Sequence, residues 1–171
     1  MNASLRLAAA LAAGFSFPVV ASAQPAERPC VSPAESEAVV SYLLPPLVTG
    51  LAGACLQRLG PDSYLAREGS RLSDRLRPMS HAAWPAARAA VQRVAKLPLP
   101  PEVIGDAAEQ TIGPVLAAGI AGQADASTCR TADRLLAALD PLPPRNLAQA
   151  MALFLEVATD KDPKAPFRIC S

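Results

Sequence analysis

The chain has 171 residues, of which 51% are hydrophobic, and a formal net charge of +1. The hydrophobic content excludes a disordered chain, and the balanced charge with 4% aromatic residues argues against a nucleic-acid-binding protein. Thirteen of the sixteen basic residues are arginine, which is typical of a bacterial protein from a GC-rich genome.

Residues 1–23 have the three-part pattern of a secretory signal peptide. One early arginine precedes an apolar run, and the small residues Ala21-Ser22-Ala23 follow it. A membrane anchor is the alternative, but the run is shorter than the ~20 residues of a spanning helix and Pro18 interrupts it. We therefore expect a mature chain of residues 24–171 that forms a single domain without a transmembrane segment. Its predicted location is periplasmic or secreted.

All four cysteines lie in this mature chain, and an even number in an exported protein indicates two disulfide bonds. A metal site is the alternative, but there is no CxxC pair, and the only histidine, His81, is remote from every cysteine. We therefore expect neither a metal nor a cofactor. Three pairings are possible. The helix order favours Cys30–Cys55 and Cys129–Cys170, because each pair would flank a hairpin of two helices.

The mature chain has helical patterns throughout and no sustained strand alternation. Ser32, Pro33 and Glu35 form the pattern of a capping box at the start of the first helix. The prediction is an all-α, compact bundle of about six to seven short helices with an extended tail from about residue 160 to 171. The predicted helices span about residues 33–44, 46–59, 62–77, 80–96, 102–122 (as one helix or two), 127–139 and 145–159.

Proline-rich segments separate these helical patterns. PLPP occurs at residues 98–101 and 141–144, and LLPP occurs at residues 43–46. The residue before a proline is disfavoured in the α region, so each segment predicts a helix boundary. A PxxP ligand for aromatic grooves is the alternative, but it normally requires a long exposed segment.

Two of the predicted helices are almost free of charge. Residues 46–59 contain only Arg58, and residues 146–159 of the last helix contain only Glu156. Helices that are apolar on most sides are buried, so we expect these two at the centre of the bundle. Their charges would then form a buried ion pair. The alternative is that burial raises the pKa of Glu156, which would make it an acid in a hydrolase that also uses Glu68 or Glu109.

Two further groups of residues are candidate binding surfaces. Arg67, Arg71 and Arg75 recur every four residues and form a basic face for an anionic surface, or an ordinary solvated helix face paired with Glu68 and Asp74. A second group is a possible aromatic and polar patch, or a helix start with the tryptophan against the core. It consists of His81, Trp84 and Arg88.

No catalytic motif is present, which favours a non-catalytic protein. The first hypothesis is an interaction protein that binds another envelope or secreted protein through an exposed apolar patch near Trp84. The alternative is a carrier for a lipid or another small apolar or anionic ligand in a cavity between the two central helices. A carboxylate-based hydrolase is the third hypothesis.

Overall fold

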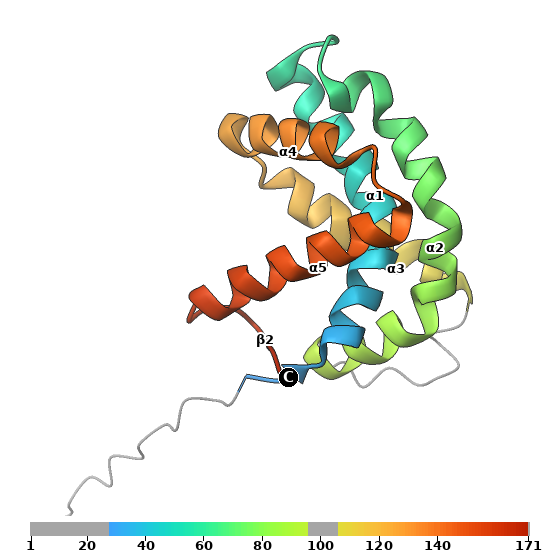
Figure 1. Ribbon diagram of the computed structural model, residues 1–171, viewed down its shortest axis with the longest axis vertical. Coiled ribbons are helices and arrows are strands. Elements are labelled where there is room, and N and C mark those ends of the chain that lie inside the picture. The colour runs from blue at the N-terminus through green and yellow to red at the C-terminus, as the bar shows by residue number, and fades with distance from the viewer. Residues whose placement is uncertain (1–27, 96–105, 171) are drawn as a thin grey trace, which may run out of the picture.

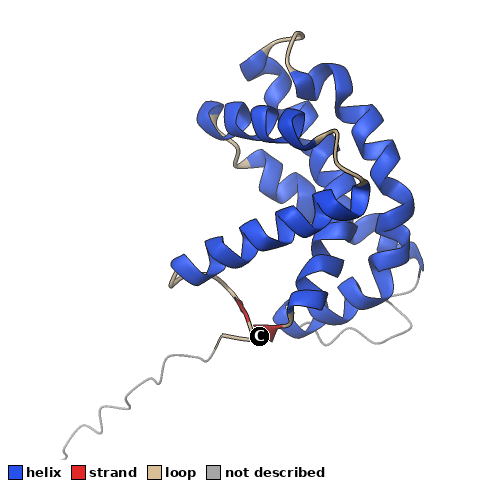
Figure 2. Cartoon of the chain, viewed as in Figure 1, coloured by secondary structure: helices blue, strands red, loops and turns tan. Residues whose placement is uncertain are grey.

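The computed structural model describes residues 28–95 and 106–170, and this part of the chain forms five helices and one pair of two-residue strands (Figure 1). Figure 2 shows that helices dominate it, which confirms the all-α class, although with fewer helices than expected. The predicted signal peptide and the first PLPP segment lie outside the described residues. The elements are β1 (Cys30–Val31), α1 (Pro33–Leu59), α2 (Tyr64–Ala95), α3 (Asp106–Gly122), α4 (Ala126–Leu139), α5 (Pro144–Lys161) and β2 (Arg168–Ile169).

Helix α1 begins at the predicted capping box. The Ser32 hydroxyl accepts from the Glu35 backbone N–H at 3.3 Å, and the Glu35 carboxylate accepts from the Ser32 N–H at 2.9 Å. The predicted boundary at Pro45-Pro46 is wrong, because α1 continues through both prolines. A proline at position 46 leaves the Tyr42 carbonyl without its intrahelical donor. The Ser80 hydroxyl of α2 replaces that donor at 2.8 Å.

Helix α2 is also continuous where two helices were predicted, with Pro78 and Pro85 in its interior. Both prolines are exposed, as are Asp74 and His81, the residues four positions earlier. Water can therefore bind the carbonyls that lose their donors. The buried side chains of α2 continue on both sides of Pro78, from Leu65, Leu72 and Leu76 to Trp84, Ala87 and Ala90. Helix α3 is likewise a single helix with Pro114 inside it.

The second PLPP segment does separate two helices, as predicted. Helix α4 ends at Leu139, and α5 begins at Pro144. Helix α4 begins at Ala126, one residue before the predicted start. Asp125 is the N-cap, and its carboxylate accepts from the Thr128 N–H at 2.7 Å.

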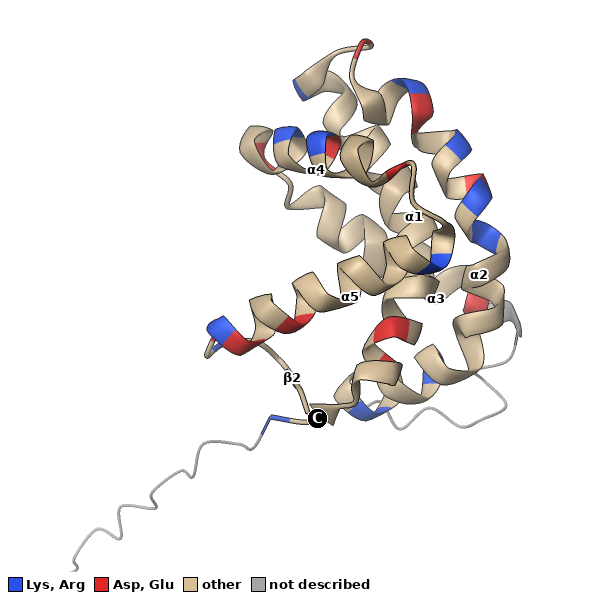
Figure 3. Cartoon of the chain, viewed as in Figure 1, with Lys and Arg blue, Asp and Glu red and all other residues tan. Residues whose placement is uncertain are grey.

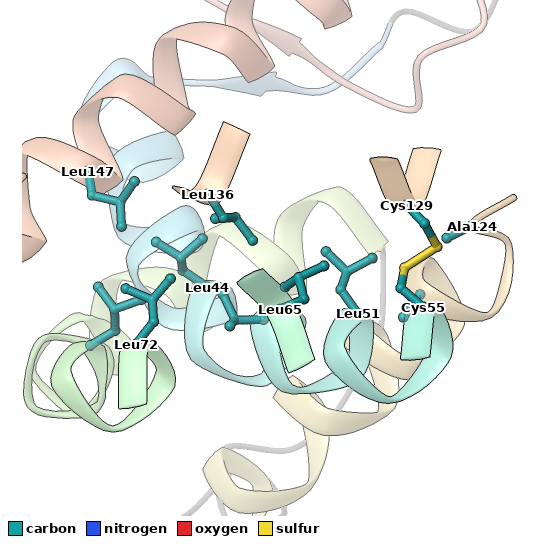
Figure 4. Close-up of a cluster of buried hydrophobic side chains, with 12 residues drawn as sticks. Leu44, Leu51, Cys55, Leu65, Leu72, Ala124, Cys129, Leu136 and Leu147 are labelled. Carbon is teal, nitrogen blue, oxygen red and sulfur yellow. A yellow bond between two sulfur atoms is a disulfide. The ribbon is translucent and has the colours of Figure 1, made fainter. Parts of the chain in front are cut away.

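Helix α1 is the centre of the molecule and contacts every other helix (Figure 1). Leucines from α1, α2, α4 and α5 pack together in one buried cluster (Figure 4). The predicted central position of α5 is wrong: only its first half packs into the cluster, at Leu147. Among the described helices, α1 alone is long and apolar enough to cross a membrane, a test that central helices of globular domains also pass.

Two disulfide bonds are present, but the favoured pairing is wrong. The bonds join Cys30 to Cys170 and Cys55 to Cys129. Because α1 is one continuous helix, Cys30 and Cys55 lie at opposite ends of it, more than about 30 Å apart. The C-terminal tail is held beside the start of α1, since β2 pairs in parallel with β1 next to the Cys30–Cys170 bond.

Candidate functional site

A cleft of about 630 Å³ is open to solvent where α1, α2 and α3 meet. This volume is within the range of small-molecule pockets. The cleft lies beside α3, and not between α1 and α5 as the carrier hypothesis expected. Its apolar wall consists of Pro45, Pro46, Gly50, Pro114 and Ala118, and its polar side chains include Thr49, Ser73, Arg77, His81 and Glu109.

Tyr42 connects α1 to α3 at this cleft. Its hydroxyl donates to the Glu109 carbonyl at 2.6 Å and accepts from the Gly113 N–H at 2.8 Å. A Cβ at position 113 would lie 3.0 Å from the hydroxyl oxygen, so the close approach requires glycine there. Burial raises the pKa of Tyr42 above its ordinary value, which keeps the hydroxyl protonated and able to donate.

The hydroxyl groups on the α1 and α2 sides of the cleft bind backbone carbonyls. Ser73 donates to the Pro45 carbonyl at 3.1 Å, and Thr49 lies 3.1 Å from that carbonyl and 3.0 Å from the Ser73 hydroxyl. The Ser80 hydroxyl binds the Tyr42 carbonyl. The hydroxyls of Ser73 and Ser80 therefore hold the backbone around the proline pair.

His81 and Glu109 form an interhelical pair at the cleft, with 2.5 Å between His81 Nδ1 and Glu109 Oε1. The His81 side chain is 62% exposed, whereas that of Glu109 is 16% exposed. Because a carboxylate only accepts, Nδ1 carries the hydrogen of this bond. One helical turn before His81, Arg77 pairs with Asp74 at 2.5 Å.

The predicted patch of His81, Trp84 and Arg88 does not form one exposed surface. Trp84 is 5% exposed and packs against Tyr42, with 4.8 Å between the ring centroids. Arg88 is half-buried. The patch expected near Trp84 is therefore wrong, and the alternative, a tryptophan against the core beside an exposed histidine, is confirmed.

The three arginines of the predicted basic face differ in their surroundings. Arg71 contacts both Glu68 at 2.6 Å and Asp140 at 2.7 Å. Arg75 contacts the Asp140 carboxylate at 2.7 Å, whereas Arg67 is exposed. Burial raises the pKa of Asp140, but Arg71, Tyr64 and Arg75 together outweigh this effect and lower the pKa below its ordinary value. Figure 3 shows acidic residues between the basic ones along α2. Arg71 and Arg75 therefore join α2 to the end of α4.

The predicted buried ion pair between Arg58 and Glu156 is absent. Both residues are exposed, and Arg58 donates to the Ala54 carbonyl at 2.6 Å. Since α5 is peripheral, the Glu156 carboxylate lies at the surface beside β2. The alternative prediction, a buried acid at position 156, is therefore also wrong.

Helices α3 and α5 each expose a group of large apolar side chains. On α3, Val115, Leu116 and Ile120 are 39–63% exposed. On α5, Leu153, Phe154 and Val157 are 52–63% exposed. The second half of α5 extends away from the other helices (Figure 1). This position explains why an apolar helix that appeared central has an exposed apolar face.

The fold and the cleft define a disulfide-linked, all-helical protein with an open interhelical pocket. In comparisons with protein-family models, curated proteins and solved structures, the chain matched none. The sequence pointed to His81 and Glu109 separately, but not to their contact or to the role of Tyr42. The available signal was the group of three prolines within helical patterns, at positions 45, 46 and 114, which the structure brings together in the cleft.

Proposed function

We propose that this protein is an exported, non-catalytic binding protein of the bacterial envelope or extracellular space that holds a small ligand in the cleft between α1, α2 and α3. The observation that carries the proposal is the cleft itself, with an apolar wall of proline, glycine and alanine and a few polar groups at its edge. Pockets that bind small molecules have this composition.

Other features support the same proposal. Two disulfide bonds favour an oxidising compartment, because cytosolic thiols are normally kept reduced. The hydroxyls of Ser73 and Ser80 are bound to backbone carbonyls, which favours binding over nucleophilic catalysis. Prolines on two walls limit backbone motion, so the cleft requires little ordering when a ligand binds.

Native mass spectrometry of the mature protein, purified from a periplasm without added ligand, tests the proposal. We expect the protein to retain extra mass from a bound molecule. Ala118 lines the cleft, so Ala118→Phe should fill it and remove that mass. Ala66→Phe, at an exposed position of α2 outside the cleft, is the matched control and should retain it. Equal ligand mass in both variants would contradict the proposal.

A second candidate is a protein partner bound by the exposed face of α5. Leu153, Phe154 and Val157 favour it, because large apolar side chains grouped at helical spacing mark interaction surfaces. Phe154→Asp should abolish co-purification of a specific envelope protein, whereas Ala118→Phe should leave it unchanged. If Phe154→Asp does not alter co-purification, this candidate is excluded.

A further inference from the structure

The outer half of α5, residues 153–161, packs little against the other helices. Its side chains Leu153, Phe154 and Val157 are 52–63% exposed, and this half extends away from the bundle (Figure 1). Two hollows open to solvent lie beside it, one of about 270 Å³ towards the start of α1 and one of about 650 Å³ towards β2. A helical segment this short is marginal in water without tertiary packing, so another contact must keep it ordered.

The chain that follows α5 supplies such a contact. Residues 162–170, which we call the strap, return from the end of α5 to the start of α1, where β2 pairs with β1. The Cys170 N–H donates to the Val31 carbonyl at 2.9 Å. Arg28, which precedes β1, donates to the Asp162 carbonyl at 3.1 Å, directly after the last residue of α5. The strap and the residues before α1 therefore join the outer half of α5 to the bundle.

A disulfide bond closes the strap. It joins Cys30 of β1 to Cys170, the residue after β2, across a sequence separation of 140. Two paired strands are marginally stable by themselves, and here each has only two residues. Holding together two segments so far apart in the chain also costs conformational entropy, which a covalent bond removes. The Cys30–Cys170 bond is therefore the contact that decides whether the strap stays in place.

This bond is also the one that a reductant can reach. Cys30 is exposed and Cys170 is half-buried, whereas Cys55 and Cys129 are 1% and 0% exposed. Thiol–disulfide exchange requires direct attack of a thiolate on a sulfur, so access controls its rate. A reductant should therefore open the strap while the second bond still joins α1 to α4 inside the core.

We infer that the Cys30–Cys170 bond is a redox-sensitive latch that keeps the outer half of α5 helical. A dithiol opens the latch: one thiolate attacks a sulfur of the bond and forms a mixed disulfide, and the second thiolate then closes the disulfide of the reductant. Both cysteines leave as thiols, so the protein gains two electrons and two protons that the dithiol loses.

Opening the latch changes one surface of the protein. With the strap released, residues 153–161 lose their helical order, and Leu153, Phe154 and Val157 no longer form one face. The first half of α5 stays in place, because Leu147 is buried in the core. The inference is independent of the ligand proposed for the cleft, and it makes the α5 face available only in the oxidised protein.

Hydrogen exchange followed by mass spectrometry of the mature protein tests the inference. In a variant with both Cys30→Ser and Cys170→Ser, amides of residues 153–161 should exchange at least about tenfold faster than in the wild type, because local opening sets the rate. Amides of α1, α4 and the first half of α5 should exchange at the wild-type rate.

Reversible reduction of the wild type gives the same test without a substitution. A limiting amount of dithiothreitol should free only Cys30 and Cys170, as peptide mapping after alkylation verifies, and should accelerate exchange in residues 153–161. Reoxidation should restore the slow exchange. The variant with Cys30→Ser and Cys170→Ser, treated with the same reductant, is the matched control and should show no further change in these residues.

Three results would overturn the inference. If residues 153–161 exchange at the wild-type rate with the bond open, strand pairing and Arg28 hold the strap without it. If all helices exchange faster together, the bond stabilises the whole domain and is not a latch. If dithiothreitol frees all four thiols at once, the bond is not selectively reducible. None of these results bears on the cleft, whose ligand is measured on the oxidised protein.

Discussion

The hydroxyl of Tyr42 on α1 accepts a hydrogen bond from the backbone N–H of Gly113 on α3 at 2.8 Å. It also donates to the Glu109 carbonyl. In a regular α-helix the Gly113 N–H would bind the Glu109 carbonyl directly, so the Tyr42 hydroxyl is inserted between these two groups. Tyr42 thereby links the central helix to the wall of the cleft. The contact depends on the absence of a side chain at position 113 and on a protonated phenol.

Tyr42→Phe should lower the free energy of unfolding by about 1–3 kcal/mol, because it leaves a buried N–H and a carbonyl without their partner. The phenylalanine ring can still pack against Trp84, so the loss is attributable to the hydroxyl. Urea denaturation followed by circular dichroism measures it. An unchanged midpoint would mean that α3 closes its own hydrogen bond when the hydroxyl is absent.

Gly113→Ala should also destabilise the protein, although alanine favours helices by about 1 kcal/mol over glycine. The new Cβ would lie 3.0 Å from the Tyr42 oxygen and 3.1 Å from its ring carbon, so Tyr42 must move. Gly119→Ala on the same helix is the control, since a Cβ there has no neighbour within 4 Å. It should stabilise the protein in the same urea titration. Equal effects at both positions would contradict the proposed close approach.

Ser80→Ala should cost about 1–3 kcal/mol, because Pro46 leaves the Tyr42 carbonyl dependent on the Ser80 hydroxyl. Pro46→Ala restores a backbone N–H at position 46. In that background, Ser80→Ala should cost clearly less, and a double-mutant cycle by urea denaturation measures the difference. Additive effects of the two substitutions would show that the hydroxyl does not compensate for the proline.

The two disulfide bonds should differ in their reaction with a reductant. Cys55 and Cys129 are 1% and 0% exposed, whereas Cys30 is exposed. A mild phosphine reductant should therefore open the Cys30–Cys170 bond first, and peptide mapping after alkylation identifies the freed thiols. Replacing both Cys55 and Cys129 by alanine should cost about 4 kcal/mol, the loop-entropy value for this separation. Simultaneous labelling of all four thiols would contradict this order of reduction.

Acid should weaken the contact between the start of α1 and the end of α2. Hydrogen bonds from Arg93 and Ser32 lower the pKa of Glu35 from 4.5 to about 2. A carboxyl with a lowered folded-state pKa stabilises the protein above its unfolded-state value, and this contribution is lost as the pH falls from about 4.5 to about 2. Glu35→Gln should therefore flatten the decline of unfolding free energy across this interval, measured by urea titrations at several pH values. A decline as steep as that of the wild type would contradict the assignment.

Part of the candidate site was accessible from the sequence. His81 was recognised as a possible polar group, and residues 102–122 were recognised as one helix or two. The partner of His81 and the insertion of Tyr42 were not, because Glu109 and Gly113 are 28 and 71 positions away in the chain. Which side chains meet across helices depends on the packing of α1 against α2 and α3.

The sequence by itself determined the local features: the all-helical class, the start of α1 at Ser32, and the break between α4 and α5 at the second PLPP segment. Each of these features depends on residues within one or two helical turns of each other, so the residue pattern is sufficient to predict it. Only the tertiary structure decided that α1 continues through Pro45-Pro46, since the hydroxyl that binds the Tyr42 carbonyl, which Pro46 leaves without its donor, belongs to Ser80 of α2. That continuity in turn separated Cys30 from Cys55 and so excluded the favoured pairing.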